Sequence, residues 1–397
     1  MTIVHVEQDR RFMSIRTCLK YLRLATPVAR AAVAAIIGTI VCGPLSRLAA
    51  QPTQLISEAR PYCTGCAIRL ARVTNLGNDF GDRGAIARPI GFALGEKGQS
   101  YVVYNGRPFE IVVHNARGEV VRKIGQLGSG PGEFQFISTI VITRGDTLHA
   151  FDTRLHRRTI IAPDARVIRT VPLPTGTIAA TVLRGDRVVM AATVLNERTI
   201  GFPLHTISAT GRIERSYGVD VAFYRSDLAD ALMRSVAAAS DSTFWSANHS
   251  EYRIEQWHMN GKRLRAMHRN PSWFSVWNVS ANPHPDSLPQ SAILSVSPDS
   301  AGRLWVISRL ADSRWRTALE RDTTTNRGRY RVRDHEMYWD TLVDVIEPAT
   351  GRVLASQRFD AAFGLFFSRQ HVLLAAEASD GVLTLSLNKL ALSYPNP

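Results

Sequence analysis

The chain has 397 residues, of which 45% are hydrophobic and 21% are charged, so it can bury a substantial core and is not of the disordered class. Its formal net charge is +14, and because lysine occurs only five times, arginine carries nearly all of the basic character. These arginines are dispersed and are not interleaved with aromatic residues that could stack on bases, so the composition does not indicate nucleic-acid binding.

Residues 1–50 have the layout of an export signal. The basic residues Arg16, Lys20, Arg23 and Arg30 precede an apolar run over residues 31–41, and small residues follow at Ala49 and Ala50. Because a bilayer span needs about 20 apolar residues, this run predicts a secretory signal peptide that is cleaved near Ala50, with no membrane span left after cleavage. The alternative is an uncleaved inner-membrane anchor, and both Met1 and Met13 are candidate starts.

Residues 51–66 form a lead that contains the two remaining cysteines, Cys63 and Cys66. Loss of the seven basic and two acidic residues of positions 1–50 would lower the net charge from +14 to +9. Ala67 stands where a c-type haem site requires histidine, and zinc would need two further ligands that no nearby motif supplies. In an oxidising compartment, this spacing predicts a local Cys63–Cys66 disulfide.

From residue 67 to 397 two short units repeat. A tight turn, with glycine or aspartate in the first five copies, leads into a short apolar strand at six places: 98–103, 145–148, 185–190, 240–245, 302–307 and 368–374. A strand, a tight turn and a second strand follow most of them, at 112–121, 160–168, 208–213, 259–264 and 347–354. Two hairpins per repeat predict a four-stranded antiparallel sheet, and six such sheets arranged radially form an all-β, six-bladed β-propeller.

Two insertions widen the spacing in the second half. Residues 270–290 contain four prolines and therefore cannot form one regular element. Their aromatic residues Trp273, Phe274 and Trp277 either cover a hydrophobic edge or cap the channel. Residues 311–334 contain seven arginines and predict a long polar hairpin or loop on one blade. A seventh blade is the alternative, although no seventh turn and strand occurs there.

One repeat, residues 124–161, carries a specific motif. It reads Gly-Ser-Gly-Pro-Gly-Glu-Phe over residues 128–134 and continues as Asp-Thr-Arg-Leu-His-Arg over residues 152–157. This repeat resembles the NHL-type repeat and the bacterial six-bladed propeller proteins that carry a G-x-G-P-G-E-F element, with Leu155 in place of the family's asparagine. The resemblance is confined to this repeat, and it implies the same propeller fold.

The motif residues have structural roles in this interpretation. Three glycines let the chain turn as it leaves one sheet for the next, a proline stiffens the crossing, a phenylalanine fills the gap between blades, and an aspartate accepts backbone N–H groups. These residues are Gly128, Gly130, Gly132, Pro131, Phe134 and Asp152. We further expect residues 68–73 to supply the outer strand of the last blade, beside residues 382–387.

Candidate ligand-binding residues lie in the loops that follow the second strand of each blade, at the mouth of the central channel. They are Asn105, Arg154, His156, Asn248, His249 and Arg309. Such side chains could hydrogen-bond a ligand, although exposed loops are polar in most proteins. His156 and His249 could share a metal, but no carboxylate is positioned by its spacing to join them, so we predict neither a metal nor another cofactor.

The sequence favours a secreted or periplasmic protein of the bacterial envelope, with a non-catalytic binding or scaffold function. Its partners would be proteins, peptides or glycans, and their identity is not encoded in any motif. The alternative is a propeller enzyme, a metal-dependent lactonase or other hydrolase, or a lyase, with its site at the channel mouth. No catalytic residue is predicted, because the chain contains neither a serine nucleophile elbow nor an HExxH motif.

Overall fold

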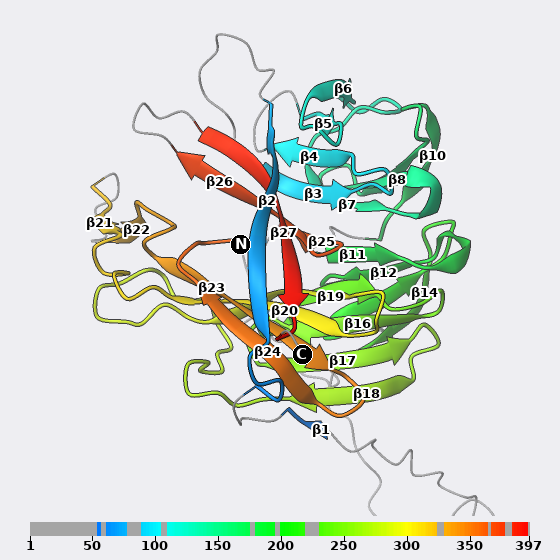
Figure 1. Ribbon diagram of the computed structural model, residues 1–397. Helices are drawn as coiled ribbons and strands as arrows, with labels where there is room; N and C mark the ends of the chain where they lie inside the picture. Colours follow the sequence, from blue (N-terminus) through cyan, green and yellow to red (C-terminus); the bar gives the residue numbers. More distant parts are fainter. Residues whose placement is uncertain are drawn as a thin grey trace, which may run out of the picture. The chain divides into compact units, whose positions relative to one another are not determined.

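In the computed structural model, the described residues are 54–56, 61–77, 89–104, 109–174, 179–194, 199–218, 230–323, 329–363, 367–377 and 383–395. The expected signal segment, residues 1–50, lies outside this set. The described residues form six four-stranded antiparallel sheets, so the predicted six-bladed β-propeller is confirmed (Figure 1).

The first three blades use consecutive strands, from the inner to the outer edge. Blade 1 contains β3 (Pro89–Leu94), β4 (Ser100–Tyr104), β5 (Ile111–His114) and β6 (Val120–Ile124). Blade 2 contains β7 (Ile137–Ile142), β8 (Leu148–Asp152), β9 (Arg157–Ile161) and β10 (Val167–Pro172). Blade 3 contains β11 (Ala179–Val182), β12 (Val188–Ala191), β13 (Leu204–Ile207) and β14 (Ile213–Tyr217).

The last three blades carry additions to this plan. Blade 4 contains β15 (Arg234–Ala238), β16 (Thr243–Asn248), β17 (Arg253–His258) and β18 (Arg263–His268), and β1 (Gln54–Leu55) is added in parallel to β18. Blade 5 contains β19 (Ala292–Pro298), β20 (Leu304–Ala311), β23 (Trp339–Glu347) and β24 (Arg352–Phe359). Between β20 and β23, β21 (Leu319–Arg321) and β22 (Tyr330–Val332) form a separate antiparallel hairpin. Blade 6 contains β25 (Phe367–Ser368), β26 (His371–Glu377), β27 (Leu383–Ser393) and β2 (Ala67–Leu76).

The short turns agree with the repeat pattern. Each of the six turn-and-strand units leads into the second strand of a blade, namely β4, β8, β12, β16, β20 and β26. Short 3-10 turns precede the second strands of blades 2 and 3, at Arg144–Asp146 and Arg184–Asp186, and a third precedes β15 at Asp230–Leu232. Inside the first two, Gly145 and Gly185 have φ angles of 69° and 73°, which favour glycine.

The ring closes through the N-terminal strand β2. Inner strands of successive blades contact one another, and β25 of blade 6 contacts β3 of blade 1. β2 pairs antiparallel with β27 from Ala67 opposite Ser393 to Leu76 opposite Leu385, so the strand that begins the ring is the outer strand of its last blade (Figure 1). The predicted closure is therefore confirmed.

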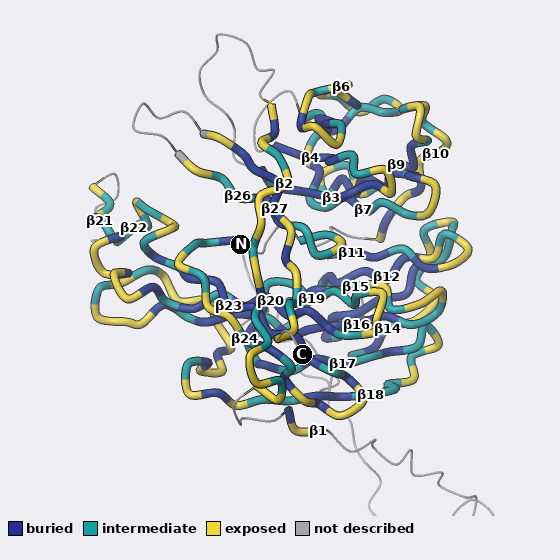
Figure 2. Tube along the Cα trace, in the orientation of Figure 1, coloured by how far each residue is buried: buried dark blue, intermediate teal, exposed yellow. Residues whose placement is uncertain are grey.

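The core lies between blades. Residues of blades 1 and 2 form one buried apolar cluster, and similar clusters join blades 4 and 5 and blades 5 and 6. The second strands of the blades, such as β4, β8, β12, β16 and β20, are mostly buried, whereas exposure concentrates in the turns and on outer strands such as β2 and β6 (Figure 2). Because a blade packs on both faces, consecutive positions are buried in strands such as β4, β5, β8 and β12.

The N-terminal lead follows the outer edges of blades 4 and 5 before it enters blade 6. Ile56 is buried in the cluster between blades 4 and 5, and its N–H donates to the carbonyl of His268 over 2.7 Å. The N–H of Tyr62 donates to the carbonyl of Val353 in β24 over 2.8 Å. The predicted Cys63–Cys66 disulfide is present and ends one residue before β2, where the chain turns into the closing strand.

The glycine-rich crossing from β6 to β7 is fixed by buried groups of blade 2. Phe134 is fully buried in the cluster between blades 1 and 2. The carboxylate of Asp152 accepts N–H groups of Gln135, Phe136, Arg154 and Leu155, at 2.7–3.2 Å. One carboxylate thus holds both the end of the crossing and the turn after β8.

Arg157 is a second anchor of the crossing, and it was not identified from the sequence. Its guanidinium donates to the carbonyls of Ser129, Gly130 and Glu133, each over 2.7 Å. The Glu133 carboxylate accepts from the Gly130 N–H over 2.7 Å. The charged residues of the motif therefore make contacts within the crossing.

Candidate ligand-binding site

A pocket of about 200 Å³ lies against the end of β20, where blade 5 carries its insertion. One wall is the segment between β18 and β19, and the other is the segment between β20 and β23. Its lining includes Pro283, Leu288, Arg309, Val332, Tyr338 and Trp339. The two insertions that interrupt the repeat therefore build the pocket together.

The first wall is anchored by its aromatic residues. Phe274 and Trp277 are buried, and Trp273 packs against the cluster between blades 4 and 5. The indole N–H of Trp277 donates to the carbonyl of Ser291 over 2.7 Å, and the Ser291 hydroxyl donates to the carbonyl of Trp273 over 2.8 Å. These contacts match the edge-covering interpretation of the three aromatic residues.

The two walls contact each other directly. The Nε of Arg316, in the blade 5 insertion, donates to the carbonyl of Pro285 over 3.1 Å. The rings of His284 and Tyr330 meet edge to face, with centroids 5.4 Å apart. The pocket is therefore bounded by walls that hold each other in place.

Arg309 is the charged residue of the pocket lining. Its guanidinium carbon lies 4.5 Å from the centroid of the Trp339 ring, a cation–π contact. Burial lowers the pKa of Arg309, and its Nε has no hydrogen-bond partner. Among the residues that the structure describes, no carboxylate forms an ion pair with this guanidinium.

His249 follows β16 at the same end of the neighbouring blade. Burial, together with the positive charges of Arg234 and Arg309, lowers the pKa of His249 to about 4, so the ring is neutral at pH 7. Its Nε2 is buried and has no hydrogen-bond partner. The backbone of His249 is fixed at both ends, because its N–H donates to Met233 and its carbonyl accepts from Ile293.

The other predicted channel residues have different surroundings. Asn105 lies outside the described residues. Asn248 is buried, and its Oδ1 accepts from the N–H and the hydroxyl of Ser250 at 3.0 and 3.2 Å, so it stabilises its own turn. Arg154 and His156 are exposed on the turn between β8 and β9 and do not line the pocket.

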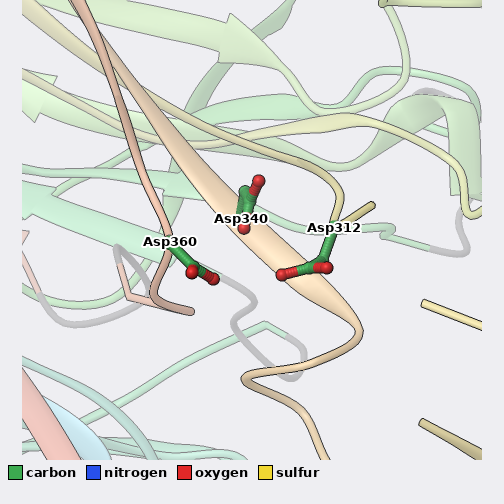
Figure 3. A group of neighbouring side chains, drawn as sticks. All are labelled: Asp312, Asp340 and Asp360. Carbon is green, nitrogen blue, oxygen red and sulfur yellow. The ribbon is translucent and has the colours of Figure 1, made fainter. Parts of the chain in front are cut away.

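Three aspartates converge nearby on blade 5 (Figure 3). Asp312 follows β20, Asp340 lies in β23 and Asp360 follows β24, and one carboxylate oxygen from each lies within 4.8 Å of the others. No sequence signal indicated this group, because its members come from three separate segments. Within the described part of the chain, neither His156 nor His249 belongs to a convergent group of this kind.

Two guanidinium groups compensate most of this negative charge. Arg314 donates to Asp312 over 2.9 Å and to Asp360 over 2.6 Å, and Arg358 pairs with Asp340. Hydrogen bonding to Arg314 holds the pKa of Asp312 well below its usual range, whereas burial raises the pKa of Asp340. Carboxylates of this kind suit Ca²⁺ or Mg²⁺, but here the arginines already act as their counterions, so the group ties the insertion to β23 and β24.

Comparison with known proteins identifies the fold. No family model matches the sequence, and no curated protein matches it either. A member of the DUF4221 family from Bacteroides vulgatus has a TM-score of 0.56 at 9% identity, covering 83% of this chain and 99% of that one. A putative exported protein from Bacteroides fragilis has a TM-score of 0.52 at 10% identity, covering 85% and 99%.

A virginiamycin B lyase from Staphylococcus aureus also matches, with a TM-score of 0.41 at 10% identity, covering 81% of this chain and 99% of that one. The likenesses to the two Bacteroides proteins show the fold alone. The resemblance to the NHL-type repeat stays a prediction. The part of the chain that the structure describes contains no helix with the length and apolar character of a membrane span.

Proposed function

We propose that this propeller is an exported, non-catalytic binding or scaffold protein, and that a protein, peptide or glycan partner docks at the end of the ring where the blade 5 pocket opens. The observation that carries the proposal is the pocket itself, built by two insertions that the propeller does not need for closure. Pockets with apolar walls and few polar groups are the usual form of ligand sites.

The rim of this pocket carries exposed apolar side chains that suit contact with a partner. Val276, Val279 and Leu288, all on the first wall, have 61%, 56% and 66% of their surface exposed. Large apolar side chains that gather on one exposed segment commonly mark an interaction surface. The same face therefore combines a pocket that can hold one chemical group of a partner with an exposed apolar surface around it.

Export is supported by two observations. A disulfide joins Cys63 and Cys66, and such bonds persist in oxidising compartments outside the cytosol. Residues 1–50 carry the signal pattern described above. No observation favours an enzyme in particular, because within the described residues the convergent acidic group is paired with Arg314 and Arg358.

Partner capture tests the proposal with a matched pair of variants. Leu288→Asp places a charge on the pocket rim, and Val121→Asp places the same charge on the outer strand β6, where Val121 is 51% exposed. Wild-type and variant proteins would be immobilised and incubated with a solubilised envelope extract, and bound proteins and glycans would be quantified by mass spectrometry. We expect the recovered amount of one set of partners to fall about tenfold with Leu288→Asp and to stay unchanged with Val121→Asp.

Recovery that is the same for all three proteins would contradict a partner site at this rim. Thermal unfolding of each variant verifies that it is folded, because both positions are exposed and neither substitution removes a buried contact.

A further inference from the structure

We propose that the blade 5 pocket binds the carboxylate end of an apolar ligand, in the form that the C-terminal residue of a peptide presents, and that Arg309 receives the carboxylate. This inference rests on the proposed function and specifies the chemistry of its ligand.

Among the residues that the structure describes, Arg309 has no anionic partner. A guanidinium that is partly removed from water is costly unless an anion accompanies it, and the neighbours of Arg309 are the face of Trp339 and the side chain of Tyr338, both uncharged at pH 7. Its Nε–H is buried and makes no hydrogen bond. A ligand carboxylate would accept from the planar fork of this guanidinium in the bidentate way that the two groups favour.

The charge of the pocket lining matches that of a single carboxylate. Arg309 is the charged residue of the pocket lining, and His249 beside it is neutral at pH 7 because burial lowers its pKa to about 4. One positive charge compensates one carboxylate. A phosphate monoester carries roughly −1.5 to −2 at neutral pH and would remain partly uncompensated here.

The walls and the size of the pocket limit what it can hold. Pro283, Leu288, Val332 and Trp339 give the pocket apolar sides, four uncharged polar residues also line it, and no carboxylate does. Its volume of about 200 Å³ is below the range of roughly 300–1,000 Å³ that holds whole drug-sized ligands. The pocket therefore suits one end group with an apolar side chain, while the rest of the ligand crosses the exposed rim.

Calorimetric titration of the purified protein with two small probes tests this inference. The probes are N-acetyl-L-phenylalanine, which has the carboxylate, and its carboxamide, which has the same body without the charge. We expect the acid to bind about tenfold or more tightly than the amide, because hydrogen bonds to charged groups are the strong ones. Glucuronate and inorganic phosphate, titrated in parallel, represent a sugar acid and a dianion.

Three variants test whether Arg309 causes the preference for the acid. Arg309→Gln is expected to reduce the affinity for the acid to that for the amide, and to leave the affinity for the amide unchanged. Arg166→Gln removes an exposed arginine from the turn between β9 and β10 and should change neither. Because Arg309 is partly buried, Arg309→Lys is included as a variant that keeps the charge, and it should retain part of the preference for the acid.

Equal affinity for acid and amide, tighter binding of glucuronate or phosphate than of the acid, or a preference for the acid that survives in Arg309→Gln would each overturn the inference. Absence of binding by every probe would also overturn it. Partner capture that still depends on Leu288 would then leave the proposed function standing, so the two failures are distinguishable.

Discussion

At the scale of single residues, several buried histidines are held neutral. His149 and His205 are fully buried, and burial lowers the pKa of each to about 4. The bonds of His205 agree with a neutral ring: its Nε2–H donates to the carbonyl of Ala192 over 3.2 Å, and its Nδ1 accepts from the Ser216 hydroxyl over 2.8 Å. Protonation would add a charge that this environment does not compensate.

We therefore predict that the protein loses stability as the pH falls from about 6.5 to about 4. A histidine whose pKa is lower in the folded state stabilises that state above its unfolded pKa, and the contribution is lost as the pH falls toward its folded pKa. For His205 the loss is about 3 kcal/mol at most by pH 4, at 1.36 kcal/mol per unit of pKa. Thermal unfolding across this pH range measures it.

His205→Gln isolates this contribution, because glutamine can still donate to Ala192 and accept from Ser216 but does not titrate in this range. The pH dependence of the variant should be shallower than that of the wild type. His156→Gln, at an exposed position, should leave it unchanged. Parallel curves for His205→Gln and the wild type would show that His205 is not one of the groups responsible.

At the scale of elements, the crossing between blades 1 and 2 combines a buried ring with a network of backbone bonds. The N–H of Phe134 donates to the carbonyl of Gln126 over 2.7 Å, and its carbonyl accepts from Gly128 over 3.1 Å. Gly125 turns the chain at a φ of 88°, and a Cβ there would overlap the Phe134 ring. Gly125 thus leaves room for the phenylalanine that joins the two blades.

Phe134→Ala is expected to destabilise the protein by about 3–5 kcal/mol, since it leaves a cavity in a fully buried cluster. Urea unfolding at equilibrium measures the change. Phe136→Ala is the matched control, because Phe136 lies two residues further on and has 40% of its surface exposed. A similar cost for both substitutions would mean that the buried ring does not join the blades.

The sequence predicts the elements well because each blade repeats the same local rules. A turn residue followed by a short apolar strand is a local signal, and it identified the second strand of all six blades. The pocket could not be predicted in the same way. The position of Arg309 in the repeat makes it a candidate. Tyr338 and Trp339, which line the same pocket, follow an insertion that has no repeat and no regular period, so no pattern places them beside Arg309.

At the scale of the whole ring, stability depends on joining the two ends of the chain. β2 provides the outer strand of blade 6, and Ile68 is buried in the cluster between blades 5 and 6. Without β2, strand β27 would expose a full edge of unpaired backbone groups. Because inner strands of adjacent blades contact one another around the circle, loosening blade 6 also weakens the contact of β25 with β3.

Deletion of residues 51–76 is therefore expected to lower the thermal unfolding temperature strongly and to cause aggregation. Two point variants on the same strand keep its backbone and test how much of the effect comes from buried side chains. Ile68→Asp places a charge in the buried cluster and should cost several kcal/mol, about 3 or more. Val73→Asp changes a side chain with 49% of its surface exposed and should cost about 0.5 kcal/mol or less. An unfolding temperature that the deletion leaves unchanged, or equal effects of the two point variants, would show that β2 does not close the ring.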